Sequence, residues 1–310
     1  MIPEHHPVWL DVLSALGEDV HRLDSLLYTI TSAQGITVVN SLPYIAYGGP
    51  SSPDAAPLLQ LRSLAEGVGA DVLSVGTSPW LSEEEEQMYR DALAPTHVFQ
   101  NSVQLQSLAT HPLEQLSNKR RDAIESELRR CAREGVVAIG RLSEEQLEQW
   151  LAIYRRRYAE IGADPYPDAF HRELYARPEV AEFRGLIDRN GRLLGGIVFL
   201  VSSDTVTYFS SAFDSGVRRL FPTTFLLNHA FDAFRERGIE RFNWHSSPSQ
   251  GGVHAYKQRW GAREHRHFYL STLLKRDSAI FSIAPRDVRR LFPFRFVLPF
   301  DAWPRTIGGE

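Results

Sequence analysis

The sequence has one cysteine, Cys131, in 310 residues. A single cysteine cannot form an internal disulfide, so a reducing compartment such as the cytoplasm is the simplest expectation. The longest apolar runs, such as residues 195–201, are far shorter than the roughly 20 residues that a membrane helix needs. The N-terminus also lacks the basic start and apolar stretch of a signal peptide. We therefore expect neither export nor a membrane span.

Positive charge is scarce in the first third of the chain. Residues 1–116 contain 3 Lys and Arg against 14 Asp and Glu, whereas residues 117–310 contain 31 against 24. With 43% hydrophobic residues, the chain can form two domains without help from metal or disulfides. The basic remainder suggests a polyanionic ligand, although scattered surface charge would give the same totals.

Two stretches share one plan of helix, glycine and strand. Residues 56–80 place apolar side chains at helical spacing, reach Gly69, and continue into an apolar strand. Residues 225–249 do the same around Gly238, at an offset of 169 residues. This repetition indicates a duplicated α/β unit. Strand-like sequence precedes both copies, and before the second copy Asn190-Gly191 has the composition of a hairpin turn.

Two helices are predicted between the copies. Ser117 is placed to cap a helix over residues 118–134, with Ile124 and Cys131 on its apolar face. Its other face is a row of cations: Lys119, Arg120, Arg121, Arg129, Arg130 and Arg133. Ser143 and Gln146 form the capping-box pattern of the next helix, which carries three consecutive arginines at 155–157. Both helices therefore expose basic faces.

Five segments, taken in their order along the chain, resemble the FemABX family of acyltransferases. They are "SLPYIAYGGP" (41–50), "LSNKRRDAIESELRRCAREGVVAI" (116–139), "YFSSAFD" (208–214), "RGIERFNWHSS" (237–247) and "GVHAYKQRWGA" (252–262). The resemblance implies an α/β (α+β) fold of two GNAT-like units in tandem, each a mixed, mostly antiparallel sheet flanked by helices. The expected units are residues 1–115, trimmed relative to the family, and residues 116–310, which begin with the basic helix and carry the donor site.

The predicted donor site departs from a standard coenzyme A site. GNAT enzymes that use acyl-CoA hold its pyrophosphate on backbone N–H groups of a glycine-rich turn at a helix start. Here the turn has Arg218 and Arg219, but Leu220, Phe221 and Pro222 occupy the glycine positions, and proline has no N–H. This favours an aminoacyl-tRNA donor, as in family members of that kind. The cations predicted to bind such a donor are Arg218, Arg219, Lys119, Arg120 and Arg129; solvated helix faces are the alternative.

The resemblance implies catalytic roles for Tyr256 and Lys257. The family's lysine of an aromatic-Lys pair lies close to the ester that is cleaved, where an ammonium stabilises the negative charge that builds on oxygen. An exposed lysine on a short helix is the alternative. No general base stands out, and Asp214 fits a turn cap better.

The acceptor is expected to contact both units. By resemblance, the acceptor-binding residues are Tyr44, Tyr47, Arg157, Tyr158 and Tyr208, and packing in the core is the alternative for the tyrosines. His245, His254, His265 and His267 are close in sequence but match no zinc motif, so no metal is expected.

The leading interpretation is an N-acyltransferase that moves an aminoacyl group from aminoacyl-tRNA to the free amine of a peptide, peptidoglycan-precursor or peptide-antibiotic acceptor. Acyl-CoA-dependent transfer to an amino sugar or other small amine is the second interpretation. A non-catalytic module that binds RNA or a glycan is the third. We expect a monomer without a permanently bound cofactor.

Overall fold

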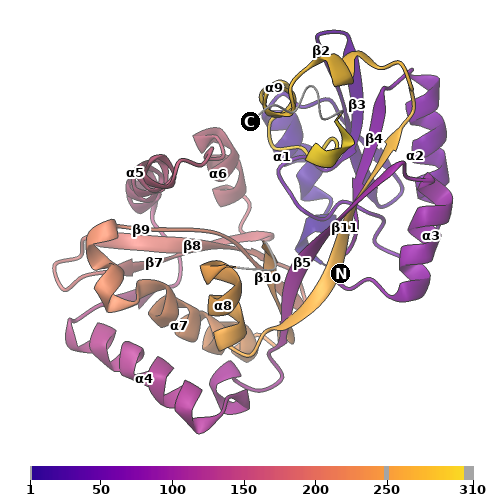
Figure 1. Ribbon diagram of the computed structural model, residues 1–310. Coiled ribbons are helices and arrows are strands. Elements are labelled where there is room, and N and C mark those ends of the chain that lie inside the picture. The colour runs from indigo at the N-terminus through magenta and orange to yellow at the C-terminus, as the bar shows by residue number, and fades with distance from the viewer. Residues whose placement is uncertain (1, 248–250, 304–310) are drawn as a thin grey trace. The chain divides into compact units, whose positions relative to one another are not determined.

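The computed structural model describes residues 2–247 and 251–303, which form two compact units (Figure 1). The first unit contains residues 4–103 and 265–303, with Ser246 and Ser247. The second contains residues 104–245 and 251–264, with Ile2 and Pro3. The chain thus leaves the first unit near residue 103 and returns to it near residue 265. A single boundary after residue 115 does not account for that return.

The first unit contains a mixed sheet in the order β1-β2-β3-β4-β11. Its strands are β1 (Val20–Leu23), β2 (Leu26–Ala33), β3 (Ile36–Ser41), β4 (Val72–Gly76) and β11 (Arg263–Leu273). Only β3 and β4 pair in parallel, and the other pairs described are antiparallel. Its α-helices are α1 (Val8–Ala15), α2 (Ala56–Gly67), α3 (Glu83–Leu93) and α9 (Pro285–Leu291).

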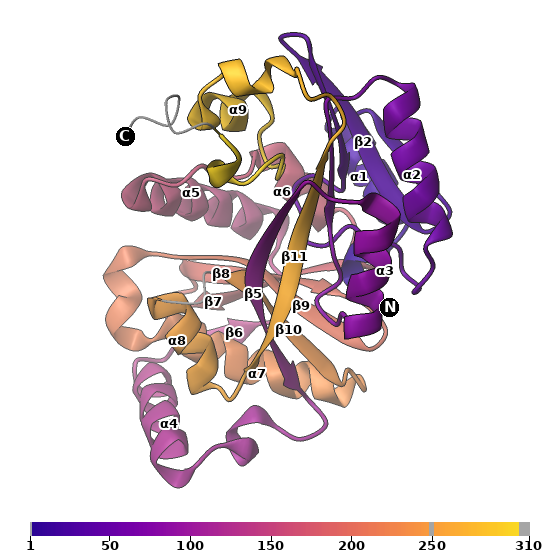
Figure 2. The ribbon, with the colours of Figure 1, turned by 45° about the vertical axis from the view of Figure 1, so that its right-hand side comes forward.

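Two apolar layers cover the faces of this sheet. Helices α2 and α3 pack on one face around Leu61, Leu73 and Leu93. On the other face, α9 and the short helices η4 (Ala279–Ser282) and η5 (Phe300–Ala302) pack around Val38 and Phe292. Figures 1 and 2 show α2 and α3 together on one side of the strands and α9 on the other. Residues 279–303 therefore complete a core that residues 4–103 leave open.

The second unit contains a sheet in the order β5-β10-β9-β8-β7-β6. Its strands are β5 (His97–Ser107, which begins in the first unit), β6 (Val137–Ile139), β7 (Ala181–Ile187), β8 (Leu193–Val201), β9 (Thr205–Phe213) and β10 (Arg241–Ser247). Strands β6 to β9 pair antiparallel in order, and the predicted hairpin turn at Asn190-Gly191 joins β7 to β8, with Gly191 at φ +80°. Strand β8 is buried along its whole length because helices cover both faces.

Helices α5 (Glu144–Ile161) and α6 (Asp168–Tyr175) lie on one face of this sheet (Figure 1). Helices α4 (Asn118–Arg133), α7 (Pro222–Glu236) and α8 (Gly252–Arg259) lie on the other. Short helices η1 (Pro3–His5), η2 (Pro112–Gln115) and η3 (Ser215–Leu220) complete the described elements. The capping box of Ser143 and Gln146 starts α5 as predicted. Ser117 occupies the N-cap of α4 but makes no side-chain cap hydrogen bond.

The predicted duplication is confirmed by the two units. Helix α2 ends at Gly67 and α7 at Glu236, and their following strands begin at Val72 and Arg241. In each unit, the strand after the helix pairs in parallel with the strand before it over three positions. Among the described helices, none is long and apolar enough to cross a membrane.

Candidate acyl-donor site

Strands β9 and β10 pair in parallel only as far as Thr207 and Asn243. The buried Asn243 side chain marks this point, because its Oδ1 accepts the N–H of His245 at 2.9 Å and its Nδ2 donates to Thr207 Oγ1 at 3.4 Å. His245 has φ 64°, which is uncommon for a residue other than glycine. The Asn243 side chain and the left-handed backbone of His245 thus replace the next backbone hydrogen bonds between β9 and β10, and the two strands stop pairing there.

Lys257 lies on α8, and only 4% of its surface is exposed. Its Nζ donates a hydrogen bond to the carbonyl oxygen of His245 at 2.8 Å, so the ammonium lies at the end of the β9–β10 pairing. Burial lowers the pKa of Lys257 to about 8. At neutral pH the side chain is therefore mainly protonated, and its charge is lost just above that range.

Tyr256 precedes Lys257 and packs partly buried against the core of the second unit. Its hydroxyl lies 3.3 Å from Thr224 Oγ1 on α7. Burial raises the pKa of Tyr256 to about 12, so the phenol is neutral at physiological pH. Tyr256 and Lys257 therefore have different surroundings. Tyr256 lines the pocket described next, whereas Lys257 donates to the carbonyl oxygen of His245 on β10.

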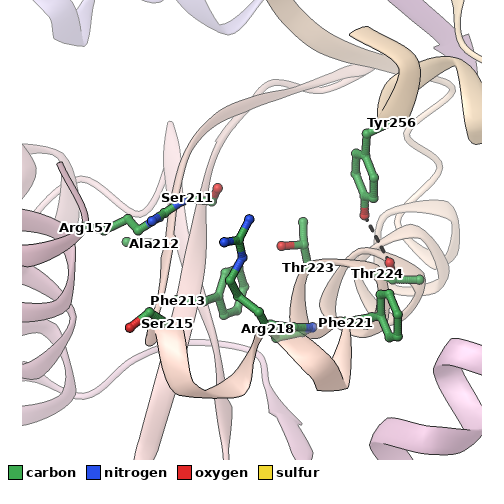
Figure 3. Close-up of a pocket in the computed structure, with 11 residues that line it drawn as sticks. Arg157, Ser211, Ala212, Phe213, Ser215, Arg218, Phe221, Thr223, Thr224 and Tyr256 are labelled. Atoms are coloured by element: carbon green, nitrogen blue, oxygen red, sulfur yellow. Dashed lines mark hydrogen bonds between the residues drawn. The ribbon is translucent and has the colours of Figure 1, made fainter. Parts of the chain in front are cut away.

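A pocket of about 270 Å³ opens at the N-terminus of α7 (Figure 3). It is lined by Arg157, Ser211, Ala212, Phe213, Ser215, Arg218, Phe221, Pro222, Thr223, Thr224 and Tyr256. The Arg218 guanidinium points into the space between Ser211 and Thr223. The first N–H groups of a helix have no intrahelical partner and attract anions, here without Pro222, which has no N–H. Two arginines and a helix start therefore favour a negatively charged ligand.

Phe221, the residue just before α7, has a left-handed backbone conformation that glycine usually adopts. Phe221 has φ 54° and ψ 51°, a left-handed conformation that costs a residue other than glycine roughly 1–2 kcal/mol. The Arg130 guanidinium lies over its ring, 5.4 Å from the centroid. A phosphate that approached this turn would meet the Phe221 ring and the N–H-less Pro222, and the nearest helix amides belong to Thr223 and Thr224.

Of the five cations predicted to bind the donor, Arg218 lines the pocket. Lys119, Arg120 and Arg129 lie exposed on α4, and Arg129 pairs with Glu125 at 3.3 Å. Arg219 is also exposed, and its carbonyl oxygen accepts a hydrogen bond from Arg130 at 3.4 Å. These four residues belong to the basic outer surface of the second unit.

The residues predicted to bind the acceptor are divided between the units. In the first unit, buried Tyr44 stacks on Phe294 with ring centroids 4.8 Å apart, and Tyr47 is fully buried with its ring edge on His267. Burial raises the pKa of Tyr44 to about 12. Both tyrosines therefore have core packing within their own unit.

In the second unit, Arg157 lines the pocket and pairs with Glu160 at 3.0 Å. Tyr208 donates its hydroxyl hydrogen to Ser211, which also lines the pocket. Tyr158 packs its ring 4.3 Å from that of Tyr154. Arg157 is thus the one predicted acceptor residue among the described pocket-lining residues.

The sequence did not point to Glu127, Thr224 or Arg259 as site residues. Glu127 Oε2 accepts the hydroxyl hydrogen of Thr224 at 2.9 Å, and its Oε1 pairs with Arg259 at 2.7 Å. These contacts join α4, α7 and α8 beneath Tyr256. No local pattern could reveal them, because Glu127 and Thr224 are 97 residues apart.

The remaining candidates have ordinary structural partners. Asp214 caps η3 by accepting the Gly216 N–H at 2.9 Å and pairs with Arg156 at 3.2 Å. Among the described residues, no group of three or more His, Cys, Asp or Glu side chains is arranged to hold a metal ion. Cys131 is buried in the core, where burial raises the pKa of its thiol to about 11.

Residues 118–258 match the family model described as acetyltransferase (GNAT) domain. This match indicates an acyltransferase domain of the GNAT type in the second unit, and the two helix–strand units show a tandem GNAT-type fold. The predicted fold class is confirmed. A comparison with curated proteins found no match.

Three solved structures share the fold at low sequence identity. FemX is 11% identical, with 86% of this chain and 94% of FemX covered and a TM-score of 0.64. The C-terminal domain of a putative lysylphosphatidylglycerol synthetase from Agrobacterium fabrum is 15% identical, with 85% and 87% covered and a TM-score of 0.61. A tandem GNAT protein from the clavulanic acid biosynthesis pathway is 10% identical, with 83% and 82% covered and a TM-score of 0.50.

Proposed function

We propose that the protein transfers an aminoacyl group from aminoacyl-tRNA to the free amine of a peptide, peptidoglycan-precursor or peptide-antibiotic acceptor. One observation carries this proposal: the pocket attracts anions at the start of α7, yet Phe221 and Pro222 occupy the turn on which a standard coenzyme A pyrophosphate would lie. A single phosphate at the 3′ end of tRNA needs only the arginines and the amides of Thr223 and Thr224. The reaction would take place in the cytoplasm, where tRNA is charged.

In this reaction the acceptor amine attacks the ester carbonyl carbon. A C–N bond forms, the bond from that carbon to the ribose oxygen breaks, and a proton from the attacking nitrogen ends on the released ribose hydroxyl. Negative charge builds first on the carbonyl oxygen and then on the leaving oxygen. The Lys257 ammonium, held by the His245 carbonyl, would stabilise both charges. Arg157 and Arg218 would hold the nearest phosphate.

The exposed cations of α4 and η3 support a nucleic-acid donor. Lys119, Arg120, Arg129 and Arg219 are exposed and are not among the residues that line the pocket. A tRNA acceptor stem presents phosphates over a longer path. One structural neighbour is described as the C-terminal domain of a putative lysylphosphatidylglycerol synthetase, a name that includes an aminoacyl (lysyl) group.

Acyl-CoA is the second candidate donor, with an amino sugar or another small amine as acceptor. The match of residues 118–258 to an acetyltransferase domain favours it, as does a structural neighbour that was described with reference to acetyl-CoA. The helix start, with the amides of Thr223 and Thr224, would then bind the pyrophosphate.

The two donors are separated by one experiment. The full-length protein is incubated with a pool of charged tRNAs and candidate amines, or with acetyl-CoA and the same amines, and new amides are detected by mass spectrometry. We expect amides only with charged tRNA. Amides only with acetyl-CoA would overturn the proposal, and release of uncharged tRNA without an amide would indicate simple deacylation.

A further inference from the structure

Three side chains, of which Thr224 and Tyr256 line the pocket, form a hydrogen-bonded chain. Glu127 on α4 accepts from the Thr224 hydroxyl at 2.9 Å, and Thr224 Oγ1 lies 3.3 Å from the Tyr256 hydroxyl (Figure 3). Arg259 holds the other Glu127 oxygen at 2.7 Å. Thr224 is 2% exposed, and the Glu127 side chain is 13% exposed. The group is therefore largely shielded from water that would compete for these bonds.

The number of hydrogens fixes the direction of this chain. A carboxylate can only accept, so the single hydroxyl hydrogen of Thr224 is used on Glu127. Thr224 can then meet Tyr256 only as an acceptor, and the phenol must donate to it. The Trp260 side chain is a further hydrogen-bond partner of the Tyr256 hydroxyl, and its indole N–H can only donate. With its hydrogen turned toward Thr224, the Tyr256 oxygen then keeps one lone pair for the pocket that this residue lines.

We propose that Glu127 is a positioning residue that acts through Thr224 to present the Tyr256 oxygen to the pocket as a hydrogen-bond acceptor. The site would then select a donor substrate with an N–H or O–H group at that point. An aminoacyl ester of tRNA has two such groups near its reacting carbon, the α-ammonium and the neighbouring ribose hydroxyl. The sulfur and carbonyl oxygen of a thioester have none. This inference rests on the proposed function, because it assigns a substrate contact within the same site.

Because Glu127 also pairs with Arg259, one substitution at residue 127 should reverse the direction of the hydrogen bonds through Thr224 to Tyr256. In Glu127→Gln, the amide oxygen would remain on the Arg259 guanidinium, which can only donate. The amide N–H would then donate to Thr224, the Thr224 hydrogen would turn to Tyr256, and the phenol hydrogen would point into the pocket. The shape of the site is kept while the polarity of one atom changes.

A double-mutant cycle tests this inference on full-length protein with aminoacyl-tRNA. Glu127→Gln is expected to lower kcat/KM about tenfold in the wild-type background and less than twofold in Tyr256→Phe, because no hydroxyl then remains to be turned. Equal losses in both backgrounds would show that Glu127 only supports the fold and would overturn the inference.

Altered aminoacyl-tRNA substrates show whether the α-amine or the ribose hydroxyl donates a hydrogen bond to Tyr256. Two probes are used: tRNA esterified with the acyl group lacking its α-amine, and aminoacyl-tRNA with a 2′-deoxy terminal adenosine. The probe that lacks the contacting group should react about tenfold more slowly with the wild type, and at the same rate as normal substrate with Tyr256→Phe. Unchanged rates for both probes with the wild type would contradict the contact.

Thermal unfolding of the free protein keeps the inference separate from the proposed function. Glu127→Gln and Tyr256→Phe should have non-additive effects on Tm when Thr224 is present and additive effects in Thr224→Val, which cannot relay the bond. Additive effects in both backgrounds would overturn the hydrogen-bonded chain. If the wild type transfers nothing from tRNA, the proposed function fails, and these unfolding data still decide whether Glu127, Thr224 and Tyr256 are coupled.

Discussion

Lys257 combines a charged group with a buried position. Its lowered pKa of about 8 comes from burial, so raising the pH removes the ammonium that would stabilise the ester oxygens. We expect aminoacyl transfer to decline above about pH 8. In Lys257→Arg the charge persists to much higher pH, so the residual activity should lose this alkaline decline. An identical decline in both proteins would assign it to another group.

Removing the Lys257 charge should act on the chemical step. Lys257→Met keeps the length of the side chain, and we expect kcat to fall about 100-fold or more, the usual effect of losing one oxyanion contact. Lys275→Met is the matched control, because Lys275 is half-exposed in the first unit and pairs with Asp71 at 3.6 Å. Comparable activity of the two variants would contradict the role of Lys257.

The same substitution has a predictable effect on stability. The folded pKa of Lys257 lies below the value of 10.5 for an exposed lysine, so between about pH 8 and 10.5 the unfolded chain binds more protons. This residue's contribution to stability therefore rises with pH across that window. Lys257→Met should lack the rise, as measured by chemical unfolding at pH 7.5 and 10. Parallel changes in both proteins would contradict this account.

His171 is a buried titratable residue outside the pocket. It is enclosed by aromatic rings, with Tyr154 at 4.6 Å and Trp150 at 5.0 Å, and neither ring nitrogen has a hydrogen-bond partner among the described residues. Burial lowers the pKa of His171 to about 3. The stability contributed by its neutral form is present above the usual value of 6.5 and is lost as the pH falls toward 3.

His171→Leu should therefore make the protein less sensitive to acid. Between pH 7 and 4.5, the wild type should lose roughly 2–3 kcal/mol of unfolding free energy more than the variant. Urea unfolding at the two pH values measures this difference. His21→Leu, at a residue whose side chain is 41% exposed, is the matched substitution that controls for the loss of a histidine. If the wild type and His171→Leu lose the same unfolding free energy between pH 7 and 4.5, burial does not keep the His171 imidazole neutral in the folded protein.

At the scale of the element, the start of α7 decides between donors. In Phe221→Gly/Pro222→Ala, the left-handed turn would lose its strain and a backbone N–H would return. We expect this double variant to bind coenzyme A at least tenfold more tightly than the wild type in isothermal titration. Binding of equal strength would mean that Phe221 and Pro222 do not obstruct a pyrophosphate, and it would favour the acyl-CoA alternative.

Elements with local signals were predictable from sequence. The capping box of α5, the Gly191 turn and the repeated α2–β4 and α7–β10 units all depend on neighbours close in the chain or on a regular repeat. The site depends on distant partners. Glu127 meets Thr224 across 97 residues, and no pattern of charge or period encodes such a contact. The return of residues 265–303 to the first unit also depends on core packing far from their own sequence.

The whole chain has a formal net charge of −4, so a polyanion would approach it only through a local basic surface. The exposed cations of α4 and η3 form such a surface within the second unit: Lys119, Arg120, Arg129, Arg130, Arg133, Arg218 and Arg219. The pocket that Arg218 lines lies beside them. A tRNA that used this surface would bind with a strong dependence on salt.

Reversing three of these charges should weaken tRNA binding without changing the chemistry. For Lys119→Glu/Arg120→Glu/Arg133→Glu, we expect KM for aminoacyl-tRNA to rise at least tenfold and kcat to remain within about twofold. The slope of log KM against log salt should fall by about 2–3, since each phosphate contact contributes roughly 0.7–0.9. Arg276→Glu/Arg286→Glu/Arg290→Glu makes the same charge change on exposed residues of the first unit. If both triple variants raise KM equally, overall charge governs the encounter, and α4 is not the surface that binds tRNA.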